Sequence, residues 1–177
     1  MKKSIILLAL LCLAATLAQG QEQKTSRIET DFGYTAIKGF NGFSHATRYT
    51  WQVGKCVDLT VGLSSYIAMS VKETAPRFND GMAAYGLVAG VNHDFRLCDR
   101  CFLSATLLVG ADFELNEQSI TGKSLTTIIL QPHADLRLAL AYSCSDVCTV
   151  GPYVSASFGH GYKFCLNAGL SMGFSLK

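Results

Sequence analysis

The last sixteen residues, YKFCLNAGLSMGFSLK (Tyr162–Lys177), alternate apolar side chains with polar or small ones without exception. Because 49% of the chain is apolar, a perfect run of this length arises by chance roughly once in 10⁴–10⁵ windows. A period of two indicates a β-strand, and this one is much longer than the usual ~5–6 residues of a soluble sheet. A long strand with one apolar face and one small, polar face is typical of a membrane-spanning barrel.

The beginning of the chain has the features of a secretory signal peptide. A short basic segment precedes an apolar core, Ile5–Leu17, and small residues follow at the positions that signal peptidase requires. We therefore predict that residues 1–20 are removed before Gln21 and that residues 21–177 form one outer-membrane barrel domain. The apolar core is too short to cross a membrane as a helix, and no later stretch of ~18 apolar residues follows it.

The mature chain divides into eight candidate strands with alternating pattern. They are expected at about 27–38, 44–53, 56–71, 82–97, 101–114, 125–143, 148–158 and 162–177. Every second connection is a tight turn, and these turns are Gly54-Lys55, Asp99-Arg100 and Ser145–Val147. The longer loops include Lys72–Gly81 and Asn116–Ser124. This asymmetry indicates an all-β, eight-stranded antiparallel up-and-down transmembrane β-barrel with its short turns in the periplasm.

Charged side chains occur at the alternate positions of these strands that are opposite to the apolar face. We call this set of positions the inward phase. A charge that faces lipid costs ~2–4 kcal/mol near the midplane, so these groups are expected inside the barrel, paired as a packed polar core. An eight-stranded barrel is just wide enough for its side chains to fill, and we therefore expect no open pore. The predicted interior polar cluster consists of Asp94, Arg96, Asp112, His133, Asp135 and Arg137.

The sixth strand has two features that fit this pattern poorly. Pro132 cannot donate a hydrogen bond to a neighbouring strand, so a bulge or local kink is expected there. The segment Leu125–Leu130 is also more uniformly apolar than a barrel strand should be.

The signal peptide, the eight amphipathic strands and the turn–loop asymmetry resemble the small bacterial outer-membrane β-barrel superfamily, the OmpA/OmpX-like barrels. The resemblance is architectural and covers essentially all of the mature chain. It departs from these proteins at its end, where Lys177 stands in place of the usual terminal aromatic residue. The resemblance implies a porin-like barrel in the cell outer membrane of a Gram-negative bacterium. Because such barrels serve as anchors, adhesins and lipid-modifying enzymes, it does not decide the function.

Cysteines are the most individual feature of the chain, which contains seven. Cys98 and Cys101 flank one tight turn, and Cys144 and Cys148 flank another at the same rim. Opposed residues on antiparallel strands lie ~4.5–5.5 Å apart, within disulfide reach, and the periplasm is oxidising. We predict disulfides among these four, with Cys56 as a possible further partner, either across each turn or between neighbouring hairpins.

Two other roles for these cysteines are less favoured. The Cys98–Cys101 spacing matches a redox-active pair, but a hairpin turn lacks the helix dipole that lowers the thiol pKa in such pairs. Four thiolates could bind zinc, although an oxidising compartment opposes this.

No motif assigns a molecular activity. We predict a non-enzymatic, monomeric outer-membrane barrel with a structural or surface-interaction role, without cofactor or metal. Its predicted partners are outer-membrane lipid and an unidentified extracellular or periplasmic protein that contacts the longer loops. A net charge of +2 and 16% charged residues indicate no binding of nucleic acid.

Two alternative functions are open. An enzyme that modifies lipid or lipopolysaccharide would need a histidine beside a serine and a carboxylate. His160 near Ser157 and His45 beside Ser44 are the candidates, and neither has an obvious carboxylate partner. A soluble periplasmic carrier of the lipocalin kind would need an apolar lumen, which the polar inward residues do not supply.

Overall fold

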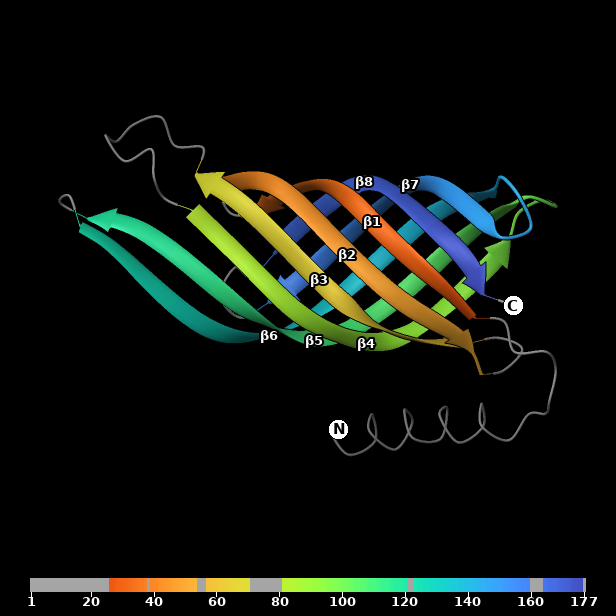
Figure 1. Cartoon of the computed structure of the whole chain (residues 1–177), viewed down its shortest axis with the longest axis horizontal. Coiled ribbons are helices and arrows are strands. Elements are labelled where there is room, and N and C mark those ends of the chain that lie inside the picture. The colour runs from red at the N-terminus through yellow and green to blue at the C-terminus, as the bar shows by residue number, and fades with distance from the viewer. Residues whose placement is uncertain are drawn as a thin grey trace.

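The computed structural model describes residues 26–37, 39–53, 57–70, 81–120, 123–159 and 164–176. These residues form a closed barrel of eight antiparallel strands, each paired with its neighbours in sequence (Figure 1). The strands are β1 (Ser26–Ile37), β2 (Phe40–Gln52), β3 (Asp58–Ser70), β4 (Gly81–Arg96), β5 (Cys101–Ile120), β6 (Lys123–Ser143), β7 (Cys148–Gly159) and β8 (Cys165–Leu176). The predicted fold class is confirmed.

Some of the sequence predictions concern residues outside these ranges. The predicted signal peptide, Cys56 and His160 lie outside the described residues. Among the helices of the described part of the chain, none is long and apolar enough to cross a membrane.

The alternation that defines the last strand places its two faces on opposite sides of the barrel wall. β8 pairs with β1 from Ser26↔Leu176 to Ile37↔Cys165, which closes the barrel. Leu170 is 61% exposed on the outside, whereas Ser171 is 8% exposed on the inside. An apolar outer wall and a polar lumen follow from a period of two, because successive side chains point to opposite faces of a strand.

The expected loops differ from the structure at two places. The segment Asn116–Ser124 was predicted to be a loop, and this was wrong, because β5 and β6 stay paired as far as Ile120↔Lys123. Similarly, β2 begins at Phe40, so only residues 38–39 separate it from β1. Gly39 has φ +86°, a left-handed conformation that a tight hairpin turn requires and glycine adopts without strain. Polar and turn-forming residues were misleading here because main-chain pairing in a hairpin does not depend on apolar side chains.

Pro132 introduces no bulge between β5 and β6. Their pairing keeps one register from Cys101↔Tyr142 to Ile120↔Lys123, and Pro132 faces Ala111 within it. Of the two expected distortions, a bulge or a local kink, the bulge is therefore wrong and the kink stays a prediction. The first pair that joins β6 to β7 is His133↔Gly159. Pro132 therefore pairs with β5 but with no described residue on its other side, and sheets tolerate proline where one side of a strand is unpaired.

Candidate functional site

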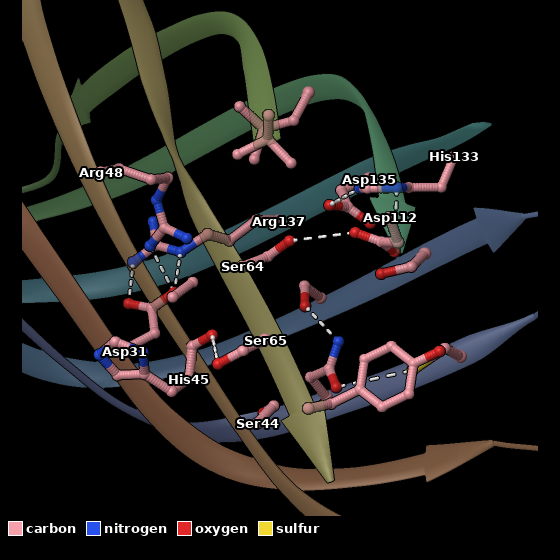
Figure 2. A pocket seen from close by; sticks show the side chains of 18 of the residues that line it. Asp31, Ser44, His45, Arg48, Ser64, Ser65, Asp112, His133, Asp135 and Arg137 are labelled. Carbon is pink, nitrogen blue, oxygen red and sulfur yellow. Dashed lines mark hydrogen bonds and ion pairs between the residues drawn. The ribbon is translucent and has the colours of Figure 1, made fainter. Parts of the chain in front are cut away.

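Arg137 of β6 occupies the centre of the barrel lumen and is 1% exposed. Its Nε and Nη2 donate hydrogen bonds of 2.8 Å each to the two carboxylate oxygens of Asp31 on β1, and Nη2 also donates to Ser171 Oγ at 2.7 Å. Arg48 of β2 donates to the same carboxylate (Figure 2). These contacts connect strands from opposite ends of the sequence, so the lumen is filled by paired charges at this level.

A second polar layer surrounds His133, which lies on the same inward face of β6. Its Nδ1 is 3.1 Å from Asp112 of β5, and its Nε2 is 3.2 Å from Asp135 (Figure 2). The hydroxyl of Ser64 on β3 donates to Asp112 at 3.5 Å. Residues 133, 135 and 137 share one face because alternate residues of a strand point the same way. The strand period thus stacks the two polar layers one above the other.

Asp94 of β4 belongs to a third group, nearer the short turns. It accepts hydrogen bonds from Arg27 of β1 at 3.1 Å and from Asn92 at 3.0 Å. Asn92 in turn accepts one bond of 2.8 Å each from the hydroxyls of Ser104 and Thr106 on β5. Sequence reasoning did not identify Arg27 as the partner of Asp94, although its position in the inward phase of β1 was a usable signal.

The polar layers of the lumen enclose a small cavity. A cavity of about 60 Å³ lies between the layer around Arg137 and the layer around His133, and its lining residues include Arg48, Asp112 and Tyr153. This is room for a few water molecules and not for a carried ligand. The polar lining differs from the apolar lumen that a carrier of apolar ligands would need.

Arg96 does not join the interior cluster in which it was predicted. It is the last residue of β4, its side chain is 74% exposed, and Nη2 bonds to Asp99 at 2.9 Å in the adjoining turn. The period of two placed Arg96 on the inward face of β4. At the end of a strand, however, an inward side chain reaches solvent rather than the packed lumen.

Four of the predicted disulfide cysteines lie at two neighbouring turns on one rim. Cys98 and Cys101 face each other through two main-chain hydrogen bonds, Cys98 N→Cys101 O at 3.1 Å and Cys101 N→Cys98 O at 3.4 Å. The Cys101 thiol also donates a hydrogen bond to the Cys98 sulfur, which lowers the pKa of Cys98. Cys144 and Cys148 instead direct their thiols toward the carbonyl oxygens of Tyr142 and Thr149. All four thiols are free in the structure, so the disulfides stay a prediction.

The opposite end of the barrel has an uneven rim. The β5–β6 hairpin extends beyond the ends of β7 and β8 (Figure 1). From Lys123 to Pro132, β6 pairs with β5 on one side and with no described residue on the other. Ile128, Ile129 and Leu130 on this free edge are 67%, 40% and 60% exposed. From Thr126 to Leu130, the apolar segment of the sequence is therefore exposed, and it pairs with no described residue on this side.

A closed eight-stranded barrel with an apolar outer wall and a lumen filled by paired charges defines a class of protein. By fold, this chain is a small outer-membrane β-barrel, and the apolar wall indicates that it spans the bilayer with its strands.

Comparison with solved structures gives the same class. Neisserial surface protein A is 13% identical over 90% of this chain and 99% of its own, with a TM-score of 0.58. The attachment invasion locus protein Ail of Yersinia pestis is 13% identical over 88% and 100%, with a TM-score of 0.58. A major outer membrane protein of Thermus thermophilus is 14% identical over 88% and 100%, with a TM-score of 0.63. No family model and no curated protein sequence matches the chain.

Proposed function

We propose that this protein is a surface-interaction protein that binds an extended segment of a partner along the free edge of β6. The observation that carries the proposal is that this edge of β6 pairs with no described residue and also carries the exposed apolar side chains of Ile128, Ile129 and Leu130. Because the hairpin lies at the end opposite the short turns, it belongs on the outer face of the membrane.

An edge of this kind is normally protected. Sheets shield their edges with lysine, proline or bulges, because a bare row of N–H and C=O groups recruits other strands. The exposed segment Thr126–Leu130 carries no charge, and the only proline of the edge, Pro132, lies at its base. The absence of protection over this segment favours a binding role.

The chemistry of the edge selects the form of the partner. Main-chain donors and acceptors in a row pair with an extended chain, while alternate side chains on either face supply apolar contacts. Ile128 and Leu130 lie in the outward phase of β6, and Ile129 lies in the inward phase. The preferred partner is therefore a strand-forming segment rich in β-branched and apolar residues.

The structural neighbours are compatible with such a role. Ail is described as an attachment invasion locus protein, and Neisserial surface protein A as a surface protein. The enzymatic alternative has less support. In the described residues, His45 contacts threonine hydroxyls and Ser44 contacts the hydroxyl of Tyr153, and no described contact joins either residue to a carboxylate.

The test compares two double variants in lipid nanodiscs. The first, Ile128→Lys with Leu130→Lys, places charge on the free edge. The second, Leu97→Lys with Val147→Lys, adds the same charge at exposed positions of the opposite rim. The probe is an immobilised, end-capped peptide of sequence Thr-Thr-Ile-Ile-Leu, and faster gel migration of unheated samples verifies that each barrel is folded.

We expect the unmodified protein and the rim variant to bind the peptide equally, and the edge variant to bind at least tenfold more weakly. Equal binding by both variants, or no binding by the unmodified protein, would refute strand addition at this edge.

A further inference from the structure

The outer wall of the barrel carries a polar cluster formed by Thr30, His45, Thr47 and Ser65. These residues share the outward phase of β1, β2 and β3, in which Thr30 pairs with Thr47 and His45 pairs with Ser65. Their neighbours in that phase are apolar and exposed, including Phe32 at 53%, Phe43 at 78% and Leu63 at 60%. The cluster is therefore a polar island on a surface that lipid covers.

The island is held together by hydrogen bonds around one imidazole. His45 Nε2 lies 3.4 Å from Thr30 Oγ1 and 3.3 Å from Thr47 Oγ1, and the two hydroxyls are 3.3 Å apart. The ring contacts that of Phe32 with centroids 4.8 Å apart. Ser65 donates to the main-chain carbonyl of His45 at 3.4 Å (Figure 2). In the described part of the chain, no hydrogen bond reaches Nδ1 of His45.

A neutral imidazole has two hydrogen-bonding nitrogens, so the described contacts satisfy only one of them. An unsatisfied polar atom in hydrocarbon is costly, since neither water nor a plain alkyl chain offers a partner. The charged groups of the polar layers described above, such as Asp31 and Arg137, lie in the lumen, where they are paired. A histidine on the outer wall is thus expected to have a partner that comes from the membrane itself.

Two apolar grooves on the outer wall meet at His45 and Ser65. One, of about 460 Å³, has walls that include Leu63, Tyr85 and Phe113. The other, of about 300 Å³, has walls that include Phe32, Phe43 and Tyr85. Both grooves can accommodate alkyl chains, and the polar side chains of His45 and Ser65 lie at their junction.

We propose that this junction binds a lipid whose acyl chain carries an oxygen function, a hydroxyl or a branching ester, which bonds to His45 Nδ1. The alkyl parts on either side of the oxygen would then lie in the two grooves. A plain acyl chain fills the grooves equally well but leaves Nδ1 unsatisfied. The site therefore distinguishes a substituted acyl chain from an unsubstituted one.

The first experiment measures lipid preference by native mass spectrometry of the full barrel. The probes are a phosphatidylethanolamine with one 3-hydroxymyristoyl chain and the same lipid with plain myristoyl chains. The variants are His45→Phe, which keeps an aromatic ring and removes its nitrogens, and Tyr49→Phe, which removes a hydroxyl from the same outer face of β2 outside the island.

We expect the unmodified barrel and Tyr49→Phe to retain the hydroxylated lipid at least tenfold better than the plain one, and His45→Phe to show no preference. Equal retention of both lipids by the unmodified barrel, or a preference that survives in His45→Phe, would overturn the proposal. So would a dimer that forms in plain lipid and is lost in His45→Phe, because a second copy of the chain would then cover the island.

A second measurement needs no variant. The ¹⁵N spectrum of the His45 imidazole in the unmodified barrel should change at Nδ1 when nanodiscs of plain lipid are exchanged for nanodiscs that contain the hydroxylated lipid. The same spectrum in both lipids would contradict a hydrogen bond at that atom.

Discussion

Arg137 on β6 and Asp31 on β1 are 106 residues apart in sequence and form a bidentate ion pair across the barrel lumen, with two hydrogen bonds of 2.8 Å. Asp31 also accepts a bond from Arg48, so one carboxylate holds two guanidinium groups. Both residues of the pair are almost completely buried. Breaking such a pair is costly, because the remaining partner keeps a buried charge without compensation.

Replacement of Asp31 by asparagine should therefore destabilise the barrel by about 3–5 kcal/mol. Glu29, whose carboxylate lies 4.0 Å from Arg137 and 3.9 Å from Arg48, compensates part of the loss and favours the lower end of this range. The measurement is urea-induced unfolding in lipid vesicles. The control is Asp99→Asn, which removes an exposed partner of Arg96 and should cause no measurable change. An equal loss of stability in Asp31→Asn and Asp99→Asn would contradict the argument that burial makes the loss of an ion pair costly.

His133 lies between Asp112 and Asp135, with Nδ1 3.1 Å from the Asp112 carboxylate and Nε2 3.2 Å from the Asp135 carboxylate. His133→Leu should reduce stability by about 3 kcal/mol, because the two carboxylates lose the ion-pair partner that they share. Adding Asp112→Asn should recover part of this loss by removing one of the two like charges. If the double variant proves less stable than His133→Leu alone, the two carboxylates do not repel each other, and the layer needs another explanation.

Gly86 of β4 is one of the glycines that lie against the His133 layer. A Cβ at this position would lie 1.7 Å from Asp112 Oδ1, and Ser64 and His133 hold that carboxylate in place. Gly86→Ala should therefore destabilise the barrel by about 1–3 kcal/mol through overpacking. Gly81→Ala on the same strand is the matched control, since its Cβ would meet no atom closer than 4.0 Å. Thermal unfolding in detergent micelles distinguishes the two variants, and equal midpoints would count against the steric argument.

Reduced Cys98 should react with iodoacetamide at lower pH than an ordinary thiol. The hydrogen bond from the Cys101 thiol stabilises the Cys98 thiolate and lowers its pKa, so the reactive form is present at lower pH. Cys101→Ala removes the donor and should shift the alkylation midpoint of Cys98 to higher pH. Identical midpoints in the two proteins would show that the hydrogen bond does not control reactivity.

Of the two cysteine pairs at the short turns, Cys98–Cys101 should form a disulfide before Cys144–Cys148. Cys98 and Cys101 face each other through two main-chain hydrogen bonds, whereas the thiols of Cys144 and Cys148 bond to separate carbonyl oxygens. Peptide mapping of protein purified from the outer membrane without reductant should therefore find the 98–101 pair linked. Full alkylation of Cys98 before any reduction would contradict this order.

Much of the architecture could be predicted from local pattern. The alternation in residues 162–177 predicted the strand, its two faces and a transmembrane barrel, because a period of two leaves no other regular structure available. The inward phase also predicted that Asp112, His133, Asp135 and Arg137 lie in the lumen, since each side chain of a strand has only two directions. The same reasoning misplaced Arg96, because a phase says nothing about where the packed interior ends.

Sequence alone determined the number of strands, the apolar outer wall and the polar lumen, because these depend on periodicities that act within a few residues. The tertiary structure decided which charges pair across the lumen, how far the β5–β6 hairpin projects, and that β6 pairs with no described residue of β7 beyond His133. These features depend on the register between strands and on the closure of β1 against β8. Because register and closure bring together residues that are distant in the chain, no local pattern contains them.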